Sequence, residues 1–109
     1  MFRVITGVIV FVVMAMPAAA QDAKVAQGAK VYAEQKCAMC HSIGDKGNQK
    51  GPLDGVATKL KGEEIRAWIV DAKSMTEKTK APRKPVMKAY TLPTEDVDAL
   101  VAYLLTLKK

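Results

Sequence analysis

The chain has 109 residues, enough for one small domain, and its seventeen basic and eleven acidic residues give a net charge of +6. A domain of this size buries a modest fraction of its surface and usually depends on a disulfide, a metal or a cofactor. Its only two cysteines lie three positions apart. A bridge between them would close a tiny loop and stabilise little, which excludes a disulfide-stapled fold.

Residues 1–20 have the pattern of a secretory signal. An early arginine precedes an almost entirely apolar run over residues 4–16, and small residues lead to Ala20. We expect cleavage between Ala20 and Gln21, leaving residues 21–109 as a single domain exported to the periplasm. An uncleaved membrane anchor is the alternative, but the apolar run is shorter than the roughly 18 residues that a membrane span needs.

Three segments of the expected domain predict helices, and none predicts a strand. The first covers residues 23–36 with Asp22 as its N-cap, and the second covers residues 63–73. The third begins at Thr94, with two acidic residues in its first turn. Its apolar stripe is the clearest in the chain: Val97, Leu100, Val101, Leu104 and Leu107. The expected fold class is therefore all-α.

Two long segments between these helices are rich in glycine and proline. Residues 42–62 show turn chemistry, with one short helical turn possible near Val56, and residues 74–93 show no periodicity. Two loops of about twenty residues each would count against a compact domain. They are reasonable if they wrap around a large cofactor.

The motif Cys37-Ala38-Met39-Cys40-His41 carries the strongest chemical signal. Its C-x-x-C-H spacing is typical of covalent c-type haem attachment. Each thiol can add to one vinyl group of the porphyrin and form a thioether. The adjacent imidazole of His41 can then bind the iron. This motif predicts one covalently bound haem c.

Two other readings of the motif are weaker. A structural zinc site needs about four Cys or His ligands, and the chain has only Cys37, Cys40 and His41. A thioredoxin-type redox dithiol expects a βαβ setting, and no strand is predicted. Haem attachment remains the preferred interpretation.

The second axial ligand of the iron cannot be a histidine, because His41 is the only one. Met39 lies inside the motif and is too close to reach the opposite face. Met87 and Met75 remain as candidates. Met87, in a polar segment behind Pro85, is preferred to Met75, which follows the Trp68 helix and suits a core contact. Either methionine could instead simply fill a gap.

These features resemble a small bacterial class I cytochrome c, a monohaem family with His/Met ligation, over essentially all of residues 21–109. The resemblance implies a helical fold in which the first and last helices cross and the loops enclose the haem. It implies thioether bonds to Cys37 and Cys40, with His41 and Met87 as axial ligands.

The resemblance also assigns supporting roles to other residues. It matches Gly28, Tyr32 and Tyr103 to the crossing of the first and last helices. The carbonyl of Pro52 would accept a hydrogen bond from the proximal imidazole. Trp68 and Tyr90 are expected in the haem pocket, where Trp68 could equally be a core anchor.

The expected function is a periplasmic one-electron carrier, not an enzyme. Two filled axial positions leave no open site for a substrate, and Met/His ligation raises the reduction potential. The alternatives are an electron-transfer subunit of a dehydrogenase or sulfur-oxidising complex, or a gas- or peroxide-reactive haem protein if the methionine ligand is labile. Visible absorption separates the carrier from the reactive protein.

Basic residues in and beside the two loops suggest redox partners with acidic docking surfaces, such as a terminal oxidase, reductase or dehydrogenase. These residues are Lys36, Lys46, Lys50, Lys80, Arg83, Lys84 and Lys88. A solvated basic surface is the alternative reason for them. We expect a monomer without nucleic-acid partners and without a stable membrane anchor.

Overall fold

The computed structural model describes residues 7–10, 12 and 18–109, and in this part of the chain it is mostly helical. The elements are α1 (Ala18–Glu34), the 3-10 turn η1 (Cys37–Met39), β1 (Ser42–Ile43), β2 (Lys46–Gly47), α2 (Val56–Lys59), α3 (Gly62–Val70), α4 (Ala72–Thr79) and α5 (Thr94–Leu104). The expected all-α class is confirmed. The unexpected strands are a two-residue antiparallel pair.

The predicted signal, residues 1–20, lies mostly outside the described residues. Its expected cleavage point, between Ala20 and Gln21, falls in the first turn of α1. Among the residues that the structure describes, no helix has the length and apolar character required to cross a bilayer.

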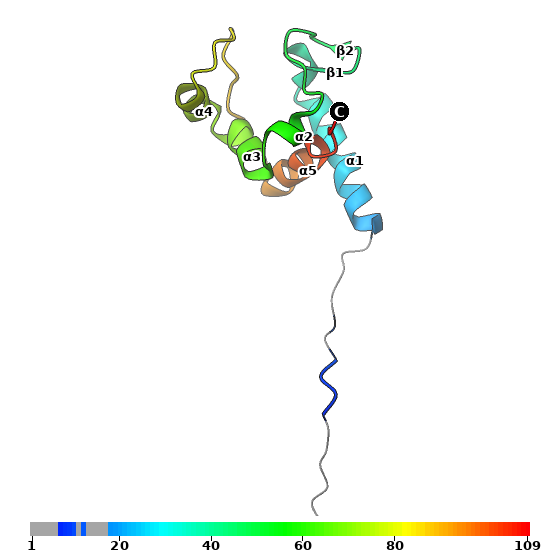
Figure 1. Cartoon of the computed structure of the whole chain (residues 1–109). Helices are drawn as coiled ribbons and strands as arrows, with labels where there is room; N and C mark the ends of the chain where they lie inside the picture. The colour runs from blue at the N-terminus through cyan, green and yellow to red at the C-terminus, as the bar shows by residue number, and fades with distance from the viewer. Residues whose placement is uncertain (1–6, 11, 13–17) are drawn as a thin grey trace, which may run out of the picture.

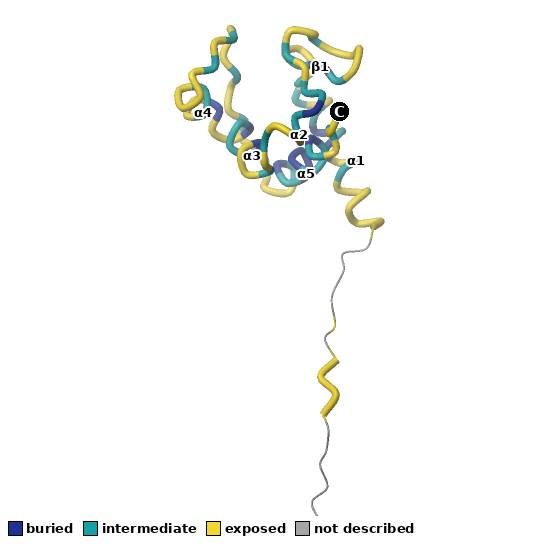
Figure 2. Tube along the Cα trace, viewed as in Figure 1, coloured by how far each residue is buried: buried dark blue, intermediate teal, exposed yellow. Residues whose placement is uncertain are grey.

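The core forms where α1, α3 and α5 meet (Figure 1). Figure 2 shows most of the buried positions gathered at this junction. The stripe predicted for the last helix is confirmed at Val97, Leu100, Val101 and Leu104, whereas Leu107 lies beyond the helix and is half-buried. From α1 and α3 the core receives Val31, Ile65 and Ile69. Burying such aliphatic side chains contributes about 1.5–3 kcal/mol each.

The first and last helices cross closely at Gly28, as the resemblance implied. A Cβ atom added there would collide with the backbone oxygen of Ala99 and lie 2.6 Å from Cβ of Tyr103. The rings of Tyr32 and Tyr103 pack edge to face beside this contact, with centroids 5.7 Å apart. Gly28 therefore has a packing reason inside a helix that would otherwise favour alanine.

The segment after Trp68 differs from the expectation of one helix followed by irregular chain. The helix α3 ends at Val70, Asp71 leaves the helical region with φ −143° and ψ 48°, and α4 then begins. The carbonyl of Asp71 accepts the amide of Met75 at 3.2 Å, which starts the new helix. Asp71 is the N-cap residue of α4 without a side-chain capping hydrogen bond, so the sequence carried only the general preference of aspartate for helix starts over helix interiors.

Tyr32→Phe should reduce the loss of stability at alkaline pH. The Tyr32 hydroxyl is buried without a hydrogen-bond partner. This burial, with smaller contributions from Cys37, Tyr103 and Asp54, raises its pKa from 10.0 to about 12. The fold thus favours the neutral phenol over the phenolate. The resulting contribution to the free energy of unfolding is complete below pH 10 and disappears as the pH rises towards 12.

Chemical unfolding of the Tyr32→Phe protein, measured by circular dichroism across this pH range, tests the prediction. At neutral pH the free energy of unfolding should stay the same or rise by about 1 kcal/mol, because an unpaired buried hydroxyl is removed. Tyr103→Phe keeps the Tyr32 phenol and should retain the alkaline loss. Equal alkaline losses in wild type and Tyr32→Phe would contradict the assignment.

Candidate functional site

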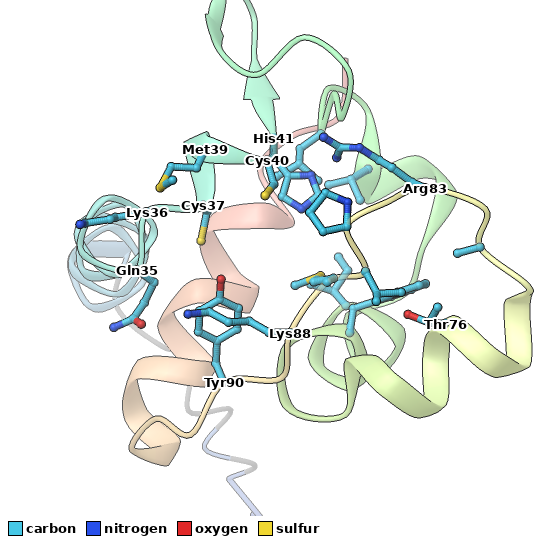
Figure 3. Close-up of a pocket in the computed structure, with 18 of the residues that line it drawn as sticks. Gln35, Lys36, Cys37, Met39, Cys40, His41, Thr76, Arg83, Lys88 and Tyr90 are labelled. Carbon is cyan, nitrogen blue, oxygen red and sulfur yellow. The ribbon is translucent and has the colours of Figure 1, made fainter.

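A cavity of about 560 Å³ separates the motif from α3, α4 and the loop before α5. This volume is within the ~300–1,000 Å³ typical of small-molecule and cofactor sites. The walls are mainly apolar side chains, which include Leu53, Val56, Leu60, Ile65, Trp68 and Val86. Figure 3 shows the motif on one wall and Tyr90, Lys88 and Thr76 towards the other. The two long loops thus enclose a common space.

The end of α1 delivers the motif to this cavity. Lys36 adopts a left-handed conformation, with φ 56° and ψ 39°, so the chain turns away from the helix axis. The turn η1 then places Cys37, Cys40 and His41 on the cavity wall. Both cysteines are free thiols, half-buried at Cys37 and exposed at Cys40. Burial raises the pKa of the Cys37 thiol.

The imidazole of His41 is oriented by one backbone contact. Its Nδ1 lies 3.0 Å from the carbonyl oxygen of Gly51. Because a carbonyl can only accept, this hydrogen bond requires a proton on Nδ1 and leaves the Nε2 lone pair free to bind a metal. Burial lowers the pKa of His41, and nearby Arg83 lowers it further against the opposing effect of the Gly51 bond. A neutral imidazole is the form that a metal requires.

The expected role of Pro52 is corrected. Ser42 forms a parallel bridge with Pro52, in which the Ser42 amide donates to the Gly51 carbonyl at 3.1 Å and the Leu53 amide donates to Ser42 at 2.8 Å. Successive carbonyls of an extended segment point to opposite sides. The Gly51 carbonyl therefore faces His41, while Pro52 is exposed and does not line the cavity.

Most of the other residues predicted for the site line the cavity, and one does not. Trp68, Tyr90 and Met87 line the cavity, whereas Met75 does not. The Tyr90 amide donates to the Ile69 carbonyl at 2.8 Å, which fixes the end of the Met87 loop to α3. The structure thus places Met87 and His41 around one space from segments far apart in sequence.

The sequence pattern missed Asn48, which holds the motif backbone. Its backbone N–H donates to the carbonyls of Ala38 and His41, both at 3.0 Å, and its side-chain Nδ2 donates to the Met39 carbonyl at 3.1 Å. Asparagine in a glycine-rich loop predicted only a turn. Nothing in the sequence indicated that the turn would fold back onto the motif.

Two of the cationic residues that line the cavity, Arg83 and Lys88, make contacts that composition could not predict. Arg83 reaches the region of His41 and Gly51, as Figure 3 shows for its side chain beside His41. Lys88 places Nζ 5.1 Å from the ring centroid of Tyr90, within the range of a cation–π contact. Both were expected only as members of a basic rim.

A structural zinc site of the expected ligand types does not assemble in the part of the chain that the structure describes. No three His, Cys, Asp or Glu side chains there form a group that could hold a metal ion. The soft or imidazole donors around the cavity are instead two thiols (Cys37 and Cys40), one imidazole (His41) and two thioethers (Met39, inside the motif, and Met87).

Comparison with known proteins gives one family. The family Cytochrome c matches residues 25–108, which include α5 and every residue assigned to the cavity above. No curated protein and no solved structure matches the chain. The match spans more than half of the chain and agrees with the helical fold and the motif. The chain therefore belongs to the cytochrome c family.

Proposed function

We propose that this protein is a one-electron carrier of the bacterial class I type, with His41 and Met87 as the axial ligands of one covalently attached haem. Membership of the cytochrome c family implies a covalently bound haem c and a haem-based electron carrier. The bound haem supplies reversible one-electron chemistry. The single observation that carries the finer proposal is the common cavity of the two thiols, the imidazole and the Met87 side chain.

The residues present fit such a group. The cavity is large and mostly apolar, and the thiols of Cys37 and Cys40 lie at the same wall, three residues apart. The bond from His41 to the Gly51 carbonyl fixes the tautomer that leaves Nε2 free. Trp68 and Tyr90 add aromatic walls. The apolar lining would exclude water and thereby affect the reduction potential.

The placement of Met87 supports its choice over Met75. Met87 lines the cavity in the loop before α5, between Pro85 and the backbone bond that anchors Tyr90. Met75 lies in α4, is half-buried and does not line the cavity. A flexible thioether reaching the cavity suits a soft axial ligand, whereas a helix-borne methionine outside it suits packing.

The periplasm is the proposed location. The pattern of residues 1–20 supports export, and cleavage after Ala20 would remove only the first turn of α1 before the crossing at Gly28. Covalent attachment suits an exported protein, because the cofactor cannot then be lost. Residues 21–109 would form the single haem domain.

Docking to acidic partner proteins is supported by the surroundings of the cavity. Lys36, Arg83 and Lys88 line it, and the exposed apolar side chains of Met39 and Val86 also lie there, with 70% and 50% of their surface accessible. Apolar contact surrounded by positive charge favours partners with an acidic rim and makes association salt-dependent. No substrate chemistry is proposed, because both axial positions would be filled.

The ferric wild-type protein should have a low-spin spectrum with a far-red methionine-to-iron absorption band. Met87→Ala should remove this band. Loss of the thioether leaves one axial position without its protein ligand and lowers the reduction potential. Visible absorption of the purified haem protein and a potentiometric titration measure both effects. Met75→Ala is the matched control, since it removes the same side chain outside the cavity, and it should leave the band unchanged.

A high-spin wild-type spectrum would contradict the carrier proposal and favour a gas- or peroxide-reactive protein. Loss of the band in Met75→Ala but not in Met87→Ala would contradict the ligand choice alone.

A further inference from the structure

Gly51 is a glycine for a reason other than backbone conformation. Its φ lies outside the left-handed region that favours glycine, unlike those of Gly44, Gly47 and Gly55. A Cβ atom at Gly51 would instead collide with Nη1 of Arg83 and with the Cys40 carbonyl oxygen. It would also lie 2.9 Å from the Arg83 Cζ. Gly51 thus provides the space in which the Arg83 guanidinium packs.

This packing brings a positive charge to the residue that orients His41. The Gly51 carbonyl oxygen accepts a hydrogen bond from His41 Nδ1, with 3.0 Å between the two atoms, and the Arg83 guanidinium packs on the same glycine. Figure 3 shows the Arg83 side chain extending to the His41 side of the cavity, although it comes from the loop that carries Met87. The lowering effect of Arg83 on the pKa of His41 agrees with this proximity.

The Arg83 charge has no carboxylate partner in the described part of the chain. The ion pairs found there join Lys30 to Glu34 and Arg66 to Asp98. Arg83 is half-buried beside a largely apolar cavity, where a charge is screened less than on the open surface. Arginine side chains keep their positive charge in proteins. The cavity wall therefore carries a permanent positive charge that no carboxylate of the described residues neutralises.

We propose that Arg83, packed on Gly51 beside His41, raises the reduction potential of the site through its positive charge. This inference rests on the proposed function, since it requires a redox group bound at His41. Gaining one electron makes the site more negative by one charge, and a nearby guanidinium stabilises that form over the oxidised one. Lysines of the outer rim, being solvated, contribute much less.

Arg83→Gln tests this in the haem-containing protein by potentiometric titration. The ratio of reduced to oxidised protein at a fixed potential should fall about three- to tenfold, from the loss of one partly buried charge. That fall equals about 28 to 59 mV for one electron. Lys84→Gln is the matched control: it removes the same charge from the next residue, which is exposed and does not line the cavity. It should change the ratio less than twofold.

Arg83→Lys keeps the charge, so its reduction potential should lie at least halfway from that of Arg83→Gln back to that of wild type. The visible spectrum of each variant should match wild type, which shows that the axial ligands are unchanged. Equal shifts in Arg83→Gln and Lys84→Gln would overturn the proposal, because net charge alone would then explain them. An Arg83→Lys potential as low as that of Arg83→Gln, or a shift that occurs only with a changed ligand spectrum, would overturn it as well.

The two proposals fail separately. The wild-type spectrum and the Met87→Ala protein test the ligands, whereas the difference between Arg83→Gln and Lys84→Gln tests the charge. A site with another sixth ligand could still show the Arg83 shift, and a confirmed His/Met site could lack it.

Discussion

Replacing both Cys37 and Cys40 by serine should abolish covalent retention of haem. A serine hydroxyl does not form the thioether, and the chain contains no other cysteine that could substitute. On a denaturing gel, the haem-dependent stain should disappear from the band of the double variant. Either single variant can form one thioether and should retain a weaker stain.

Stability should fall together with attachment. The cavity of about 560 Å³ is lined by apolar side chains, whose contacts with a bound cofactor would add to a small protein core. Thermal unfolding followed by circular dichroism should therefore show a lower midpoint for the double variant. Ala38→Ser is the matched control: it introduces a serine at an exposed position of the same motif and should keep full stain. A stained band in the double variant would contradict covalent attachment through these residues.

The features predictable from sequence were those fixed by local pattern. The apolar stripe of the last helix predicted the core positions of α5, and the C-x-x-C-H spacing predicted that the two thiols and His41 form one group. Each depends on residues a few positions apart, whose relative placement follows from helix or turn geometry. Gly28 needed more than the pattern, because only the resemblance identified the helix that crosses it.

The features that sequence could not predict depend on contacts between distant segments. Gly51 rather than Pro52 faces His41 because a one-residue bridge with Ser42 sets which carbonyl points inward. Asn48 and Arg83 had no pattern that distinguished them from turn and surface residues, yet one binds the motif backbone and the other packs on Gly51. The pairing of loops, not their composition, decided these contacts.

The helix crossing at Gly28 leads to the second prediction, that Gly28→Ala should destabilise the protein although alanine is the better helix former. Alanine in place of glycine would ordinarily gain up to about 1 kcal/mol in a helix interior. Here the added Cβ meets the Ala99 backbone oxygen and the Tyr103 Cβ, and a backbone atom inside a helix cannot rotate away. This steric clash can be relieved only if α1 and α5 move apart.

Separating these helices would weaken the core cluster to which Val31 and Leu100 belong, and the edge-to-face contact of Tyr32 with Tyr103. Overpacking of this kind usually costs about 1–3 kcal/mol, enough to exceed the helix gain. Chemical unfolding should therefore show a lower free energy of unfolding for Gly28→Ala, and a still lower one for Gly28→Val, whose branched side chain adds bulk at the same point.

Gly62→Ala is the matched control, because it makes the same substitution at a helical glycine of α3 with room for a methyl group. A Cβ at Gly62 would have its nearest neighbour, the Leu105 Cδ1, at 3.4 Å, and this is the end of a flexible side chain. The control should be neutral or slightly stabilising. If Gly28→Ala were as stable as Gly62→Ala, the two helices could not cross as closely as Gly28 requires. The arrangement that carries the motif from α1 to the cavity would then need another explanation.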